Sequence, residues 1–89
     1  MSREKIGTIK KFEELEKFKA EITLELVGEL KKGDKIAILG PVAYNPVEII
    51  EIKAKSKEAD EENKREARIV VESNDKINAR EKTTVYKID

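Results

Sequence analysis

The stretch LKKGDKIAILGP, from Leu30 to Pro41, decides how the rest of the chain is interpreted. Gly33 and Asp34 are typical turn residues, and the five residues after them are mostly apolar. Gly40 and Pro41 end this run, because proline cannot donate a hydrogen bond to a sheet and glycine permits a sharp change of direction. The stretch therefore predicts a turn, a short strand over KIAIL and a second turn.

A phosphate-binding loop is the competing interpretation of the same glycines. A Walker motif has four residues between its glycines and then Lys-Ser or Lys-Thr, so that consecutive backbone amides surround a phosphate. Here six residues separate Gly33 from Gly40, and the residue after Gly40 is a proline without an amide hydrogen. We therefore assign the glycines to turns and not to a ligand.

Upstream, the segment FKAEITLEL, Phe18 to Leu26, alternates apolar and polar residues over its whole length. This period of two predicts a half-buried strand. Phe18 also fits a helical spacing of apolar residues, so a helix and a strand are competing interpretations at this residue. We assign Phe18 to the strand, and FEELEK, Phe12 to Lys17, to a connection that can hold a short helical turn. KIGTIKKF, Lys5 to Phe12, predicts the first strand, with a bend at Gly7.

Downstream, VEIIEIKAK, Val47 to Lys55, predicts a strand whose apolar face changes parity near Ile49, as it does at a β-bulge. The charged segment from Ser56 to Ala67 predicts an exposed loop or one short helix, ARIVVES a fifth strand, and TTVYKI a sixth. Six short strands in one short chain predict an all-β, six-stranded, closed or nearly closed antiparallel β-barrel, because closure protects strand edges. We expect a single domain over residues 1–89.

Composition restricts the chemistry available to this chain. It has no cysteine and no histidine, which excludes disulfides, thiolate nucleophiles, histidine bases and the usual zinc ligand sets. Nineteen basic and 19 acidic residues give a formal net charge of zero, and the charge is carried mostly by lysine and glutamate. Such enrichment, with no glutamine, is typical of thermophile proteins, and we expect a thermophilic source.

No cofactor or metal is expected. The acidic cluster EADEEN, Glu58 to Asn63, lacks the spacing of a calcium loop and has basic residues close by, so it predicts a solvated loop. No apolar run reaches the roughly 20 residues that span a bilayer, and the first residues lack the apolar core of a signal peptide. We expect a soluble, cytoplasmic protein without a membrane partner.

The order of five segments resembles the second domain of translation elongation factor Tu and related proteins. These segments are IGTIKKF, FKAEITLELVGELKKGDKIAILGP, VEIIEIKAKSKEADEE, ARIVVES and TTVYKI. The likeness is greatest to small stand-alone elongation-factor-like proteins, and a similar barrel is appended to collagenase-like peptidases. It covers nearly the whole chain. Within it, the positions that match the family are architectural: Gly7, Leu30, Gly33, Asp34, Gly40 and Ala59.

The chain departs from the family in two loops and in one larger respect. Family members usually have a glycine before the fifth strand and a second Gly-Asp before the last, where this chain has NKREARI and AREKTTVY. The guanine-nucleotide domain and its motifs are missing, so the likeness does not imply GTP hydrolysis.

The resemblance implies a non-catalytic binding module that contacts RNA or a protein of the translation machinery. An accessory barrel that partners a collagenase-like peptidase is the alternative. No small-molecule substrate is expected. Basic residues and an exposed aromatic residue are the candidate contacts for nucleic acid, since lysines pair with phosphates and aromatic rings stack on bases. The candidate surface comprises Lys10, Lys11, Lys31, Lys32 and Tyr44.

Overall fold

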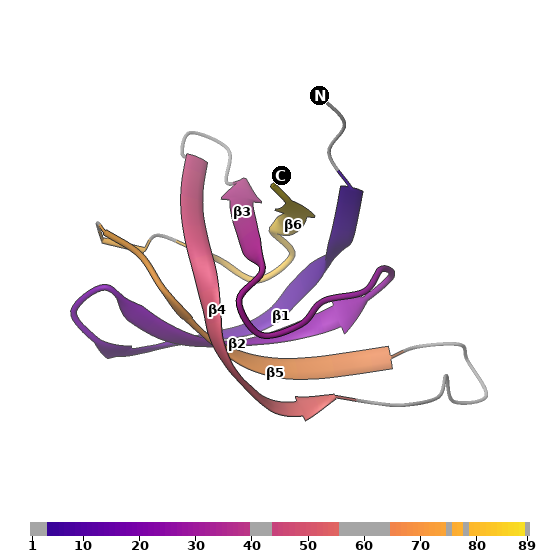
Figure 1. Ribbon diagram of the computed structural model, residues 1–89, viewed down its shortest axis with the longest axis horizontal. Helices are drawn as coiled ribbons and strands as arrows, with labels where there is room; N and C mark the ends of the chain where they lie inside the picture. The colour runs from indigo at the N-terminus through magenta and orange to yellow at the C-terminus, as the bar shows by residue number, and fades with distance from the viewer. Residues whose placement is uncertain (1–3, 40–43, 56–64, 75, 78, 89) are drawn as a thin grey trace.

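The computed structural model describes residues 4–39, 44–55, 65–74, 76–77 and 79–88, with the backbone alone at Tyr44. Within these residues the chain forms strands and no helix, and the six strands close into an antiparallel barrel in the order β1-β2-β5-β4-β3-β6 (Figure 1). The predicted fold class is confirmed. The strands are β1 (Glu4–Glu16), β2 (Lys19–Leu26), β3 (Lys35–Leu39), β4 (Tyr44–Lys55), β5 (Arg65–Glu72) and β6 (Thr84–Lys87).

The strand order combines neighbours in sequence with three long-range pairings. Strands β3, β4 and β5 follow one another as paired neighbours, and β6 returns to lie beside β3, which is a Greek-key arrangement. On the other side of this unit, β2 pairs with β5 along its whole length, from Lys19 opposite Glu72 to Leu26 opposite Arg65. Strand β6 then pairs with β1 and closes the barrel.

The core is aliphatic and follows the alternation of the strands. In β2 every second residue is buried, as its sequence predicts. Isoleucine, leucine and valine fill the interior, and the bulky side chains that are fully buried come from all six strands. They are Ile6, Ile9, Ile22, Leu24, Ile36, Ile38, Ile49, Ile69, Val71 and Val85.

The predicted connection from Phe12 to Lys17 is wrong. Strand β1 continues to Glu16, and the turn is confined to Lys17 and Phe18. Phe18 has a φ of 68° and is half-buried at this turn, not in β2. The helical spacing is overridden because Glu13 and Glu14 gain partners on β2, whereas an isolated helix of six residues has a costly nucleus.

The predictions for β4, β5 and β6 have different outcomes. The register of β4 against β5 shifts between Ile49 and Glu51, which confirms the predicted bulge. Strand β5 begins at Arg65, two residues before the expected start of ARIVVES. Residues 56–64 of the predicted charged loop, with its acidic cluster, lie outside the described residues. In β6 the fully buried residue is Val85, and its neighbours Thr84 and Tyr86 are half-buried. The turn at Gly40 and Pro41 and the loop position Ala59 lie outside the described residues.

Gly7 lies where β1 must pair with two strands at once. It is opposite Leu26 on β2 and Val85 on β6, and the register against β6 shifts beside it, as expected for a bend. A Cβ atom at this position would come within 2.3 Å of the Glu25 carbonyl oxygen. Only glycine therefore permits this approach between the backbones of β1 and β2.

We predict that Gly7→Ala lowers the free energy of unfolding by about 1–3 kcal/mol, because the new methyl group forces two backbones apart in a packed core. Urea unfolding followed by circular dichroism measures this change. Lys11→Ala, on an exposed position of the same strand, is the matched control and should change stability by less than about 0.5 kcal/mol. Equal losses in the two variants would contradict the role given to Gly7.

Candidate functional site

The five candidate contact residues come from three separate elements. Lys10 and Lys11 are exposed on β1, whereas Lys31 and Lys32 are exposed in the β2–β3 connection. Tyr44 is the first residue of β4, opposite Leu39 on β3, and its side chain lies outside what the structure describes.

Lys10 is engaged by another strand. Its Nζ donates a hydrogen bond to the Glu66 carboxylate on β5, reaching across β2. This hydrogen bond, with the charge of Glu66, raises the pKa of the Lys10 ammonium. Lys10 therefore stays charged, but a carboxylate already accompanies that charge.

Lys31 and Lys32 lie in the turn that the sequence predicts. The backbone N–H of Lys31 donates to Asp34 Oδ2 at 2.9 Å, and the Asp34 N–H donates to the Lys31 carbonyl at 3.1 Å. Gly33 has a φ of 93°, which favours glycine at this turn. The glycine and aspartate thus shape the backbone, as predicted, while the two lysine side chains remain exposed.

The outer face of the β1-β2-β5-β4 sheet is organised around Glu21. Lys53 Nζ lies 2.8 Å and Arg68 Nε lies 3.8 Å from the Glu21 carboxylate oxygens. The hydrogen bond from Lys53 lowers the pKa of Glu21, and the charges of Lys53, Arg68 and Lys11 act in the same direction. Lys53 on β4 and Arg68 on β5 thus share the Glu21 carboxylate, which balances one of their two positive charges.

A second ion-pair cluster fixes the β2–β3 connection to the barrel. Glu29 accepts from Lys55 Nζ at 3.2 Å and from Arg65 Nη1 at 3.3 Å, and these hydrogen bonds lower its pKa. The same two cations donate to backbone carbonyls, Lys55 to Leu30 and Arg65 to Gly28. The connection is therefore held against the ends of β4 and β5.

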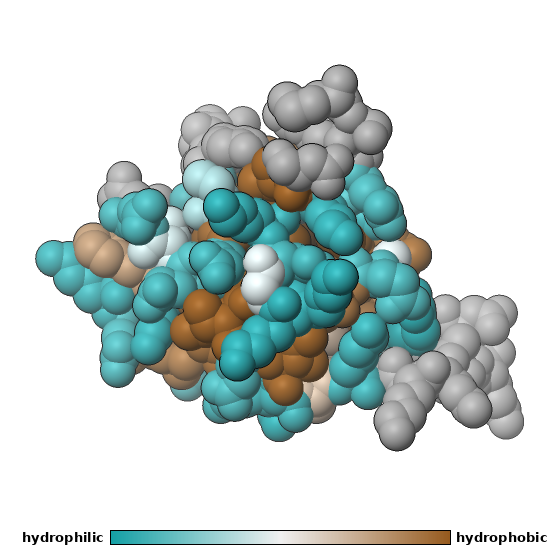
Figure 2. All heavy atoms as spheres, viewed as in Figure 1, coloured by the Kyte–Doolittle hydropathy of each residue, from teal (hydrophilic) through white to brown (hydrophobic). Residues whose placement is uncertain are grey.

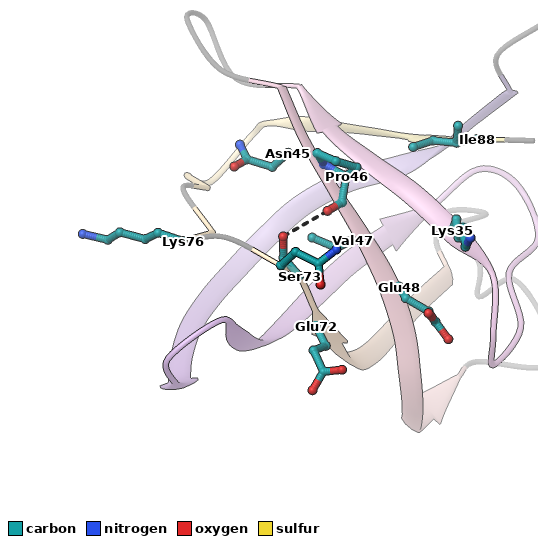
Figure 3. Close-up of a pocket in the computed structure, with 10 residues that line it drawn as sticks. Lys35, Asn45, Pro46, Val47, Glu48, Glu72, Ser73, Lys76 and Ile88 are labelled. Atoms are coloured by element: carbon teal, nitrogen blue, oxygen red, sulfur yellow. Dashed lines mark hydrogen bonds between the residues drawn. The ribbon is translucent and has the colours of Figure 1, made fainter.

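A surface hollow of about 730 Å³ opens where β4 and β5 diverge (Figure 3). The pairing of β4 with β5 starts at Glu48 and Glu72, so residues 44–47 of β4 pair with β3 alone. Across the opening, Ser73 Oγ donates a hydrogen bond to the Pro46 carbonyl at 3.2 Å. We call this the β4–β5 hollow; its lining consists of Lys35, Asn45, Pro46, Val47, Glu48, Glu72, Ser73, Asn74, Lys76 and Ile88.

Three charged residues of the β4–β5 hollow form part of a row across four strands. Lys35 on β3 is opposite Glu48 on β4, Glu48 is opposite Glu72 on β5, and Glu72 is opposite Lys19 on β2. Along the row the charges are positive, negative, negative and positive. Such a surface can form ion pairs with both the acidic and the basic side chains of a polypeptide.

Sequence analysis missed the β4–β5 hollow entirely. Alternation does place Lys35, Glu48 and Glu72 on outward positions of their strands, but it does not say which strands are neighbours. The hairpin order of β3, β4 and β5 was the signal that could have aligned them. Among the described residues, no group of three or more acidic side chains is placed to hold a metal ion.

Comparison with known proteins identifies no relative. No protein family model matches the chain, and neither a curated protein nor a solved structure is significantly similar to it. Over the described residues, no helix is long and apolar enough to cross a membrane.

The lowered pKa values of Glu21 and Glu29 predict acid sensitivity. Because each folded-state pKa lies below the ordinary value of 4.5, ionisation of these groups stabilises the fold above that pH, and the contribution is lost as the pH falls through the lowered values. We expect the free energy of unfolding in urea to decline below about pH 4.5. Glu21→Gln should make this decline shallower.

Lys53→Met is a second variant that tests the cause, because it removes the hydrogen bond that most lowers the pKa of Glu21 and leaves the carboxylate in place. It should flatten the pH dependence in the same direction, and the double variant should differ little from either single variant. An unchanged slope in Glu21→Gln would contradict the assignment.

Proposed function

We propose that this chain is a non-catalytic binding module whose partner is a protein, contacted through the β4–β5 hollow. The observation that carries the proposal is the row Lys35, Glu48 and Glu72 beside an opening in the barrel wall. Mixed charges of this kind complement a polypeptide, which presents both signs. They do not complement a uniformly negative phosphate backbone.

The placement of the basic residues also favours a protein over RNA. Non-specific RNA binding depends on several lysines or arginines that face phosphates together. Lys10 is paired with Glu66, and Lys53 and Arg68 share Glu21, so much of the positive charge on the sheet is already balanced. Of the four candidate lysines, Lys11, Lys31 and Lys32 are the ones through which an RNA contact would be made.

A protein partner is compatible with both roles that the resemblance implies. Within elongation factors such a barrel contacts other components of the translation machinery, and beside a collagenase-like peptidase it would act as an accessory interaction domain. We take the first as the proposal, because the likeness to the elongation-factor barrel covers nearly the whole chain.

Direct RNA binding is the first test. We expect no measurable affinity for transfer RNA or ribosomal RNA at about 50 mM salt, where phosphate contacts are strongest. Fluorescence anisotropy with labelled RNA at about 50 and about 200 mM salt measures this. Binding at the lower salt that weakens steeply at the higher one would overturn the proposal in favour of RNA.

Site-specific crosslinking is the second test. A photoreactive residue at Lys35, inside the β4–β5 hollow, should yield a discrete crosslinked polypeptide in native extract. The same residue at Glu51, which is exposed on β4 outside the hollow, should not. The product should weaken in the Glu48→Lys/Glu72→Lys variant, and equal labelling from both positions would contradict a site in the hollow.

A further inference from the structure

The far half of β1 has a strand neighbour on only one side. Strand β6 pairs with β1 from Glu4 to Thr8, and the last backbone bonds on that side join Ile9 to Thr83 and Lys82. Beyond this point, the described residues give the segment from Lys11 to Glu16 no strand partner except β2. Figure 1 shows this part of the β1–β2 hairpin extending away from β6.

We call the segment Lys11–Glu16 the open edge. Its six residues match the usual length of a β-strand, and an edge of this kind can pair with a strand from another chain. The open edge carries one lysine and three glutamates, Glu13, Glu14 and Glu16. Its charge therefore complements a basic segment and opposes an acidic one.

Apolar groups accompany these carboxylates. Leu15 is 42% exposed, and with Phe18 it contributes to a shallow hollow at the hairpin tip. Glu14, Glu16, Lys17 and Lys76 line the same hollow. An incoming strand that alternates basic and apolar residues would meet partners for both kinds of side chain.

A second copy of this chain fits the open edge poorly. Two identical antiparallel strands related by a two-fold axis place the central residue opposite itself, with side chains on one face of the sheet. Centring the pair on Glu13 or Glu14 sets that glutamate against its own copy, and centring it on Leu15 sets Glu14 against Glu16 twice. Like charges directly opposite one another are destabilising.

A register centred on Phe12 would pair Lys11 with Glu13 and remove this repulsion. It would also place Leu15 of each copy beside Ile9 of the other. Thr83 and Lys82 already occupy that position through backbone hydrogen bonds of 2.8 and 2.6 Å with Ile9. Because a second copy fits the open edge poorly, we infer that a different protein chain occupies it.

We propose that the open edge of β1, Lys11–Glu16, binds an extended basic segment of another protein as an added β-strand. The proposal does not rest on the β4–β5 hollow, because the open edge belongs to β1, whereas the strand residues that line the hollow come from β3, β4 and β5. Lys76 lies beside both surfaces. Main-chain hydrogen bonds would supply affinity, and the glutamates would select basic side chains.

The test uses a labelled peptide of about eight residues with alternating lysine and valine, the length of a short strand. Three matched probes are compared: this peptide, its glutamate-valine counterpart, and a lysine-valine peptide N-methylated at alternate residues. We expect the first alone to bind at low salt. Amide signals from Lys11 to Glu16 should shift in NMR spectra, and their hydrogen exchange should slow.

Matched protein variants locate the site. Glu13→Lys/Glu14→Lys should weaken binding of the basic peptide about tenfold, because attraction becomes repulsion. Glu4→Lys/Glu51→Lys changes the net charge equally at exposed positions outside both the open edge and the β4–β5 hollow, and should leave the affinity unchanged. Circular dichroism of each variant checks that the barrel is folded.

Three results would each overturn the proposal: no binding of the basic peptide at low salt, equal binding of its N-methylated form, or equal losses in the two variants. A dimer of the unmodified chain that Glu13→Lys dissociates would assign the edge to a second copy. Because the peptide comparison needs only the unmodified protein, it decides the question even where a variant fails to fold.

Discussion

Closure of the barrel by a four-residue strand is the constraint on which the other features depend. β6 pairs with β1 on one side and β3 on the other, and its Val85 is fully buried beside Gly7 and Ile38. Without β6, both β1 and β3 would be open edges over a core with no cover. The close backbone approach at Gly7 belongs to the same junction, because this residue is flanked by Leu26 and Val85.

The parts of the fold that local pattern determines were predictable, and the parts that depend on distant partners were not. The alternation of β2, the turn at Gly33 and the bulge near Ile49 follow from periodicity and turn chemistry. The extension of β1 to Glu16 does not, since its polar residues become a strand by pairing with β2. The alternation predicted Phe18 as a strand residue, but an apolar residue that continues an alternation can still occupy the adjoining turn.

In the candidate site, too, local features could be predicted and long-range contacts could not. The exposed positions of the four candidate lysines could be read from the sequence, but the pairing of Lys10 with Glu66 could not, because it depends on which strands are neighbours. The ion pairs Lys10–Glu66 and Lys53–Glu21 join residues far apart in sequence. Exposed pairs of this kind contribute little stability individually, so their larger effect is to neutralise the surface that the lysines suggested was basic. A thermophilic source stays a prediction from composition.

The pairing of Glu4 with Lys87 has a consequence for the order of folding during synthesis. β1 is made first, yet its partner β6 emerges from the ribosome last, so the nascent chain cannot close while the strands between them are being translated. During that interval the edges of β1 and β3 that β6 later covers are exposed to other chains. Contacts of such long range also slow the final step. Charged residues along β1 would then protect the unfinished barrel from aggregation as well as shape the surface of the finished one.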